Sequence, residues 1–186
     1  MKVINFNAIS SKERGYLFGL FAGDGYRFHE IKQRHFTVEF FLHSKRDKKI
    51  QEYLTFLLKK LGMNPIVYKD KRYECNRIRV YSKQFFDFIN CNFKMIDKDF
   101  KIGFISGMID AEGNINSKKS FIRAVNTDRK LLLKVKRYLC DLGINSTLST
   151  RKYSDKNWSD LHSLNISNAF INIKNNSLKV NSGVKP

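Results

Sequence analysis

The chain has 186 residues, of which 42% are hydrophobic, so it can build one mid-sized core or two small ones and is not expected to be disordered. Thirty-five Lys and Arg against 17 Asp and Glu leave a net charge of +18, which favours nucleic acid as the partner over a membrane surface. No apolar run reaches the roughly 20 residues of a membrane span, and three scattered cysteines without a CxxC pair support neither a disulfide framework nor a zinc site. The polar amino terminus is unlike a signal peptide, so we expect an intracellular protein of the cytoplasm, the nucleoid or an organelle matrix.

The first half of the chain predicts the order helix, two strands, helix, two strands, helix. Ser10 can cap the first helix, and Gly25 suits the glycine-favoured position just past its end. Apolar stripes at helical spacing predict the later helices, and alternation of apolar with polar residues predicts the strands. The expected strands cover 26–33, 35–43, 66–72 and 76–82, and the later helices cover 47–61 and 83–92.

The second half repeats the first. Residues 15–25 match residues 103–113 at a constant offset of 88 positions. Charge is repeated too, because residues 1–93 hold 18 basic and 9 acidic side chains and residues 94–186 hold 17 and 8. The repeated elements are helices at 98–111, 128–142 and 168–175 and strands within 114–126, 145–153 and 160–167.

The sequence therefore predicts an α+β fold of two pseudo-symmetric α-β-β-α-β-β-α units, residues 1–93 and 94–186. Each unit is expected to form a four-stranded antiparallel sheet with helices on one face. Small residues lie four apart on the first helix of each unit, and glycine costs about 1 kcal/mol per helical site, so close packing of the two helices is the expected reason. The stripes consist of Gly15, Gly19 and Gly23 and of Gly103, Gly107 and Ala111.

This packing would bring Asp24 and Glu112 together at one end of the helix pair. Two carboxylates at helix C-termini face the negative ends of the helix dipoles and repel each other. Hard divalent cations that bridge carboxylates and phosphates would compensate them. The alternative is that both are ordinary helix-terminal acids before a glycine, but their recurrence at matching positions favours a metal site.

Residues 17–25 and 105–113 resemble the two signature motifs of the LAGLIDADG homing endonucleases, in the single-chain form that carries both motifs on one polypeptide. The run Asp110-Ala111-Glu112-Gly113 matches the motif closely, whereas the first copy differs at Phe18, Ala22 and Gly23. The resemblance covers nearly the whole chain. It implies a monomeric, Mg²⁺-dependent endonuclease that hydrolyses both strands of a long, weakly palindromic DNA target and leaves short 3′ overhangs.

The resemblance also implies roles for individual residues. Asp24 and Glu112 would bind Mg²⁺ or Mn²⁺ with help from the backbone carbonyls of Gly23 and Ala111, and Ca²⁺ would support DNA binding without cleavage. Polar and basic groups would surround the metals, although each has a plainer reading as a strand-end histidine, a helix-capping asparagine or a solvated lysine. These candidates are His43, Asn126, Lys98 and Lys101, with Lys12 and Arg14 as further cationic candidates.

The face of each sheet without helices is expected to bind DNA. Arg, Lys, His and Ser at alternate strand positions can read base edges in a major groove, although a merely solvated sheet face would show the same alternation. The candidates for DNA contact are Arg27, His29, Lys32, Arg34, Thr37, Glu39, Lys69, Lys71, Arg77, Arg79, Tyr81, Arg123, Ser149 and Arg151.

Two other functions fit the same resemblance. One is an RNA maturase that assists intron splicing, with intron RNA as its partner. The other is a DNA-binding regulator that does not cleave. Retention of both Asp24 and Glu112 favours the nuclease with double-stranded DNA as its partner, because neither alternative needs them.

Overall fold

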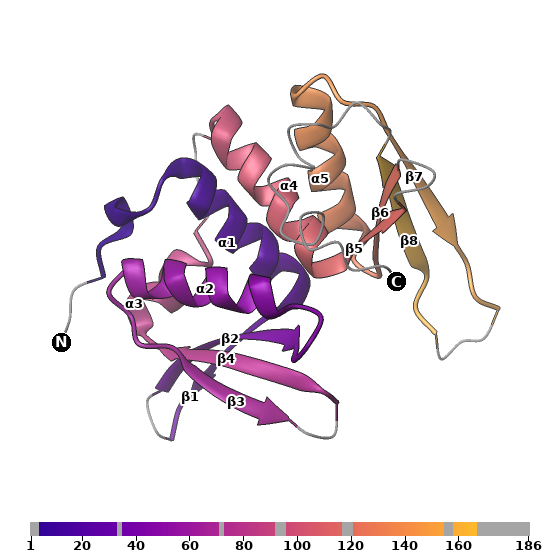
Figure 1. Cartoon of the computed structure of the whole chain (residues 1–186). Helices are drawn as coiled ribbons and strands as arrows, with labels where there is room; N and C mark the ends of the chain where they lie inside the picture. The colour runs from indigo at the N-terminus through magenta and orange to yellow at the C-terminus, as the bar shows by residue number, and fades with distance from the viewer. Residues whose placement is uncertain are drawn as a thin grey trace.

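The structure is a computed structural model that describes residues 4–32, 35–70, 73–91, 96–116, 121–154 and 158–166. Two units of the same architecture lie side by side, and their first helices, α1 and α4, run next to each other in the middle of the molecule (Figure 1). This duplicated α+β arrangement confirms the predicted fold. The expected boundary at 93/94 and the expected helix at 168–175 lie outside the described residues.

The first unit follows the predicted order, preceded by a short 3₁₀ turn, Phe6–Ala8, that the sequence did not predict. Its elements are α1 (Ser11–Asp24), β1 (Gly25–Glu30), β2 (His35–His43), α2 (Lys48–Lys60), β3 (Ile66–Asp70), β4 (Cys75–Tyr81) and α3 (Lys83–Phe88). The second unit consists of α4 (Lys98–Glu112), β5 (Gly113–Asn116), β6 (Phe121–Asn126), α5 (Arg129–Asp141), β7 (Ser146–Arg151) and β8 (Leu161–Ile166).

Each unit forms one antiparallel four-stranded sheet, with the strand orders β1-β2-β4-β3 and β5-β6-β8-β7. Helices α1, α2 and α3 contact the first sheet, and α4 and α5 contact the second. One face of each sheet is therefore covered and contributes Val38, Phe40 and Ile78, or Ala124 and Leu164, to the core. We call the opposite face of each sheet, which lies away from these helices and core residues, its open face.

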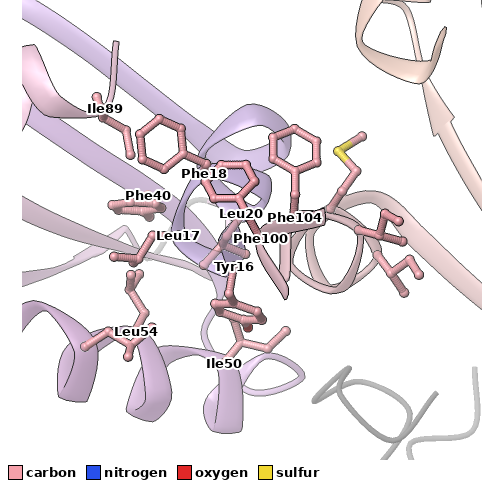
Figure 2. Packing of buried hydrophobic residues seen from close by; sticks show 14 of the residues in the cluster. Tyr16, Leu17, Phe18, Leu20, Phe40, Ile50, Leu54, Ile89, Phe100 and Phe104 are labelled. Carbon is pink, nitrogen blue, oxygen red and sulfur yellow. The ribbon is translucent and has the colours of Figure 1, made fainter. Parts of the chain in front are cut away.

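The two motif helices pack backbone against backbone. A Cβ added to Gly19 would lie 2.0 Å from the Phe104 carbonyl oxygen, and one added to Gly107 would lie 2.2 Å from that of Tyr16. Gly15 and Gly103 meet the opposite helix in the same way, so the stripes have the predicted cause. Around this contact, aromatic and aliphatic side chains of both helices join one core (Figure 2).

The helix ends differ from the sequence expectation. Gly25 and Gly113 do not adopt the left-handed conformation, because their φ angles are −97° and −81°, so each motif helix turns directly into a strand. Glycine is needed there for space, since a Cβ on Gly25 would lie 2.4 Å from the Phe21 carbonyl oxygen. Among the glycines that the structure describes, the left-handed ones are Gly62 and Gly143, which follow α2 and α5.

Candidate functional site

The two motif acids lie where the C-terminal turns of α1 and α4 touch. A Cβ added to Gly23 would lie 2.4 Å from Ala111 Cβ and 3.0 Å from Glu112 Cγ, so the chain just before Asp24 is in contact with Glu112 itself. Because β1 and β5 begin at the next residues, both acids also stand at the junction of the two sheets. The helix pair thus delivers two carboxylates, one from each repeat, to one place.

The donors at this junction suit a hard divalent cation. Carboxylates and last-turn carbonyls offer oxygen alone, and the negative ends of two helix dipoles add to the attraction for positive charge. The described residues contain no group of three His, Cys, Asp or Glu side chains that could enclose a metal. An ion held here by Asp24 and Glu112 would keep positions for water and phosphate, which is how Mg²⁺ is commonly bound.

Asn126 is tied to the second acid. Its Nδ2 donates to Glu112 Oε1 at 2.8 Å, and its Oδ1 accepts from the Asp128 backbone N–H at 2.7 Å. Asp128, not Asn126, caps α5 by accepting from the backbone N–H groups of Lys130 and Leu131. Asn126 is thereby fixed by the turn that follows β6 and orients the Glu112 carboxylate.

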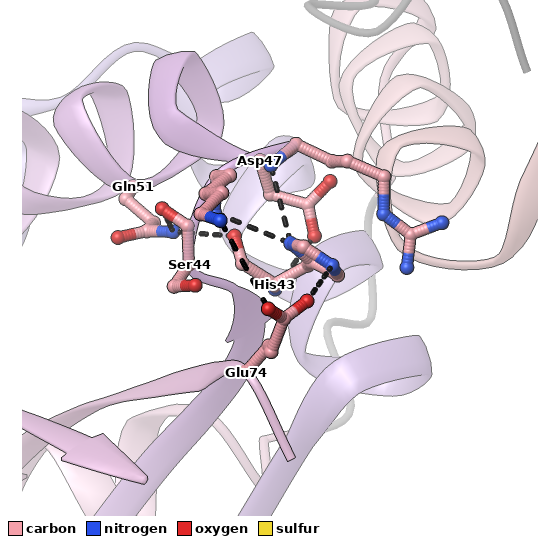
Figure 3. Close-up of polar contacts among 7 residues, drawn as sticks. His43, Ser44, Asp47, Gln51 and Glu74 are labelled. Atoms are coloured by element: carbon pink, nitrogen blue, oxygen red, sulfur yellow. Dashed lines mark hydrogen bonds and ion pairs between the residues drawn. The ribbon is translucent and has the colours of Figure 1, made fainter. Parts of the chain in front are cut away.

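His43 lies in a different setting (Figure 3). Its Nδ1 accepts from the backbone N–H groups of Lys45 and Arg46, at 3.2 Å each, and its Nε2 lies 3.7 Å from Glu74 Oε2. Its backbone N–H donates to Asp47 Oδ2 and its carbonyl accepts from Gln51 Nε2, both at 2.8 Å. These contacts close the turn between β2 and α2.

His43 and Asn126 are not matched positions of the two sheets. Phe40 lies opposite Gly25 and Ala124 lies opposite Gly113, so the counterpart of Asn126 is the buried Leu42. His43 is one residue further along and shares the face of Phe41, which has no helices. His43 and Asn126 do end the matching strands β2 and β6, as the sequence predicted, but they point to opposite faces of their sheets. Their roles at the site remain predictions.

The predicted lysines lie at the wrong end of their helix. Lys98 and Lys101 are in the first turn of α4, and the 1.5 Å rise per residue separates Lys101 from Glu112 by about 17 Å along the axis. Lys101 Nζ is paired there with Asp141 Oδ2 at 2.8 Å. Lys12 and Arg14 stand at the same distant end, in the first turns of α1. Proximity in sequence misled the prediction, because an α-helix carries its two ends apart.

The open face of the first sheet carries part of the predicted set. Residues directly opposite in an antiparallel pair share a face. Arg77, Arg79 and Tyr81 lie opposite Phe41, Glu39 and Thr37, away from the core residues Val38 and Phe40, and so lie on the open face as predicted.

Thr37 and Glu39 share the open face but are buried in it, at 0% and 3% exposure. Neither side chain is therefore available as a direct base contact, which corrects the expectation for both. Glu39 instead accepts a hydrogen bond from Arg79 Nε.

Three other predicted contacts lie on the covered side. Arg27 and His29 are opposite Val38 and Phe36, with the Arg27 guanidinium 4.9 Å from the Phe86 ring centroid and His29 stacked on Phe36 at 4.0 Å. Lys69 is opposite Asn76, also on that side. Lys32 lies in the turn after β1, and Arg34 and Lys71 lie outside the described residues.

The cause of these errors is that alternation defines two faces without saying which is open. On β1 and β3 both faces carry large side chains, and it is the aromatic and aliphatic set that faces outward. Cross-strand register places a further set of residues on the same face as Arg77 and Arg79, and sequence reasoning missed them. They are Tyr26, Phe28, Phe41, Ile66 and Tyr68.

The second sheet presents an open face that is more polar than the first. Arg123, Ser149 and Arg151 lie on it as predicted, because Arg123 and Thr147 are both opposite Asn165 and Ser149 is opposite Ser163. The side chains that sequence reasoning missed on this face are the polar Asn114, Thr147, Ser163 and Asn165 and the apolar Phe121, Val125 and Leu161. Arg123 Nε donates to Asn165 Oδ1 at 2.8 Å.

Two basic sheets joined at a pair of acids define a duplicated α+β protein of the nucleic-acid-binding type. The sequence matches the family described as LAGLIDADG-like domain over residues 11–88 and again over 99–174. The chain belongs to this family and carries two copies of the domain on one polypeptide. A search of curated proteins returned no match.

The chain is also similar to solved structures of a homing endonuclease. Mesophilic variants of the homing endonuclease I-DmoI are 26% identical with a TM-score of 0.64, and the alignment covers 84% of this chain and 89% of theirs. The structure of I-DmoI in complex with DNA and Ca is 26% identical with a TM-score of 0.67, over 84% of this chain and 83% of that one. Other I-DmoI structures contain its target DNA with Mn or Mg.

A more distant protein shares the fold alone. Full-length DUF199/WhiA from Thermatoga maritima is 19% identical with a TM-score of 0.63, and the alignment covers 95% of this chain and 57% of that one. No described helix has both the length and the apolar composition needed to cross a bilayer.

Proposed function

We propose that the chain is a site-specific endonuclease that binds double-stranded DNA as a monomer and hydrolyses both strands with Mg²⁺ or Mn²⁺. The observation that carries this proposal is the meeting of Asp24 and Glu112, one from each repeat, at the junction of two basic sheets. A monomer with two equivalent acids can address two strands, which one acid could not do. The I-DmoI complexes with DNA and divalent metals support the same assignment.

Each part of the chain has a task in this mechanism. The open faces would bind the major groove on either side of the centre and hold the backbone against the acids. Asp24 and Glu112, with the carbonyls of Gly23 and Ala111, would hold the metal, which when bound supplies Lewis acidity for phosphodiester hydrolysis. Asn126 would keep the Glu112 carboxylate in its ligating orientation, as residues behind a ligand commonly do.

The target should be long and only weakly palindromic. Each sheet would cover about one helical turn, roughly 10 bp, so the two would span on the order of 20 bp. The two open faces differ at matching positions, which removes the requirement for identical half-sites. A footprint of one short half-site, or a requirement for a protein dimer, would contradict the single-chain arrangement.

Charge removal at the acids tests the mechanism. Asp24→Asn and Glu112→Gln preserve shape, so Mg²⁺-dependent cleavage of a selected target should drop by several orders of magnitude while binding in Ca²⁺ persists or tightens. Asp99→Asn, at the opposite end of α4, is the control and should cleave normally. Metal titration calorimetry should show weakened binding in the two acid variants alone.

Two results would overturn the assignment. Duplex cleavage near the wild-type rate in either acid variant, with its fold confirmed by circular dichroism, would remove Asp24 and Glu112 from the catalytic centre. Specific DNA binding by the wild-type protein without cleavage at any Mg²⁺ or Mn²⁺ concentration would make it a DNA-binding protein of this fold and not a nuclease.

A further inference from the structure

Each sheet holds one arginine whose Nε is hydrogen-bonded by the residue directly opposite it on the neighbouring strand. In the first sheet Arg79 of β4 lies opposite Glu39 of β2 and donates from Nε to Glu39 Oε1. In the second sheet Arg123 of β6 lies opposite Asn165 of β8 and donates from Nε to Asn165 Oδ1 at 2.8 Å. Both pairs lie on the open faces.

The two pairs occupy the same place in the two sheets, with the arginine on exchanged strands. Glu39 directly precedes Phe40, which lies opposite Gly25, and Arg123 directly precedes Ala124, which lies opposite Gly113. The strand that carries the acceptor in the first sheet therefore carries the arginine in the second. The constant offset of 88 positions between the motif helices does not reveal this exchange, because strand register equates Glu39 with Arg123 and Arg79 with Asn165, at offsets of 84 and 86.

The Arg79 guanidinium is held on several sides. Nη1 donates to the Tyr81 hydroxyl at 2.8 Å, and the guanidinium carbon lies 4.7 Å from the Tyr68 ring centroid and 5.7 Å from that of Tyr81. Glu39 lies beneath it at 3% exposure, so its carboxylate is compensated by Arg79 and is not a surface group. Such a guanidinium loses little rotamer freedom when it binds a ligand.

The acceptors also restrict how these arginines can bind a base. A bidentate contact to guanine O6 and N7 needs two N–H groups on one edge of the guanidinium. With Nε engaged by Glu39 or Asn165, a bidentate contact has to use the edge formed by the two Nη atoms, and in Arg79 the Tyr81 hydroxyl already takes one of the two Nη1 hydrogens. The same restriction acts in both sheets, which is unexpected for residues that only bind phosphates.

We propose that Arg79 and Arg123 each read a guanine, one in each half of the DNA target, and that Glu39 and Asn165 are positioning residues that fix their orientation. This inference rests on the proposed DNA binding. It adds which base is recognised in each half of the target and which residue recognises it. Neighbouring strands lie about 4.8 Å apart, more than the 3.4 Å rise of a base pair. The exchange therefore places the two guanines at positions that the symmetry of the target does not relate.

Selection of bound sequences from a random duplex library, in Ca²⁺ so that cleavage plays no part, tests the proposal. Arg79→Ala and Arg123→Ala should each lose guanine preference at one position, on opposite halves, by about 5- to 150-fold. Glu39→Gln should broaden the preference at the Arg79 position alone, and Asn165→Ala at the Arg123 position alone. Asn165→Asp retains an acceptor and should restore it, which a merely structural role for Asn165 would not predict.

The controls separate this inference from the proposed function. Arg137→Ala, an exposed cation on α5, should leave every base preference unchanged. If Glu39→Gln does not fold, Tyr81→Phe tests the same position, because it removes the Nη1 acceptor without a buried change. Equal weakening for all sequences in the arginine variants, or unaltered preferences in the positioning variants, would overturn the inference; a wild-type protein that selects no sequence would instead refute the proposed function.

Discussion

The two open faces have the same strand order and register but different chemistry. The first face surrounds Arg77 and Arg79 with exposed Tyr26, Ile66 and Tyr68. Arg123 of the second face has mainly amide and hydroxyl neighbours, although its guanidinium carbon also lies 5.3 Å from the Phe121 ring centroid. Apolar groups suit contact with thymine methyls, and amides suit hydrogen bonds to base edges. Under the proposed function, the two repeats share their strand order and register but differ in the side chains that would contact DNA bases.

The motif helices, unlike the open faces, carry the same residue types at most of their matching contact positions. Gly15 and Gly19 match Gly103 and Gly107, because backbone contact between α1 and α4 tolerates no side chain at these positions. The terminal acids Asp24 and Glu112 recur at matching positions as well. One layer of this interface has nevertheless diverged. Tyr16 donates from its hydroxyl to the fully buried Asp110 Oδ2 at 2.8 Å, whereas the matching residues of the other repeat, Phe104 and Ala22, have no polar side-chain atoms. Contacts between backbones are thus conserved between the repeats more strictly than contacts between side chains.

The largest effect is expected where the helices touch. Gly19→Ala would place a Cβ 2.0 Å from the Phe104 carbonyl oxygen, and the helix backbone cannot move aside without separating the two repeats. We expect a loss of about 3 kcal/mol in the free energy of unfolding, at the upper end for overpacked sites. Urea denaturation followed by circular dichroism measures it.

The matched control for that change is Gly143→Ala. Its Cβ would meet no atom within 4 Å, but its φ of +75° disfavours a side chain, so the cost should be about 1 kcal/mol. If Gly19→Ala costs no more than Gly143→Ala, the glycine stripe is not what holds the repeats together.

Local pattern predicted the described α-helices and strands, although not the 3₁₀ turn Phe6–Ala8, and it predicted the contact between α1 and α4. Hydrophobic periodicity gave α2 and α5, and the stripe of small residues indicated a contact that depends on backbone shape alone. Local pattern could not predict which side chains of β1 and β3 lie on the open face. Arg27 and Lys69 alternate with aromatic and aliphatic residues, and only cross-strand register decides which of the two sets is covered by helices. The link between Asn126 and Glu112 likewise depends on a tertiary contact across a strand pair.

A second difference between the repeats concerns the support of the acids. Asn126 holds Glu112, and its counterpart in the first sheet, Leu42, is a buried apolar side chain that cannot do the same for Asp24. Asn126→Ala should therefore lower Mg²⁺-dependent cleavage by about 10- to 100-fold, the usual range for residues behind a metal ligand. Single-turnover cleavage across a Mg²⁺ titration measures the loss.

The control for Asn126→Ala is Asn64→Ala, an exposed amide in the loop between α2 and β3, which should cleave as the wild type does. Higher Mg²⁺ should recover part of the activity of Asn126→Ala, because the carboxylate remains and only its orientation is lost. An Asn126→Ala protein with wild-type Mg²⁺ dependence would show that Glu112 needs no such support.

The smallest expected effect comes from the polar layer that one repeat alone retains. Burial, with the nearby Asp110 carboxyl, raises the pKa of Tyr16 well above its ordinary value of 10.0, because both disfavour the phenolate. Below pH 10 the hydroxyl is protonated in the folded and the unfolded chain, so it adds no pH dependence. Above pH 10 the unfolded chain releases this proton and the folded chain keeps it, so stability falls as pH rises toward the folded-state pKa.

Tyr16→Phe removes this titration and makes the layer resemble that of Phe104. Its stability deficit relative to wild type should therefore shrink above pH 10, by up to about 1.4 kcal/mol per pH unit. Urea unfolding of both proteins between pH 8 and pH 11 measures the difference, in which the titration of all other groups cancels. Leu133→Ala, an exposed change that removes no titratable group, should run parallel to wild type. Parallel curves for Tyr16→Phe as well would mean that the Tyr16 hydroxyl does not stay protonated in the folded interface, and that this layer distinguishes the repeats in shape alone.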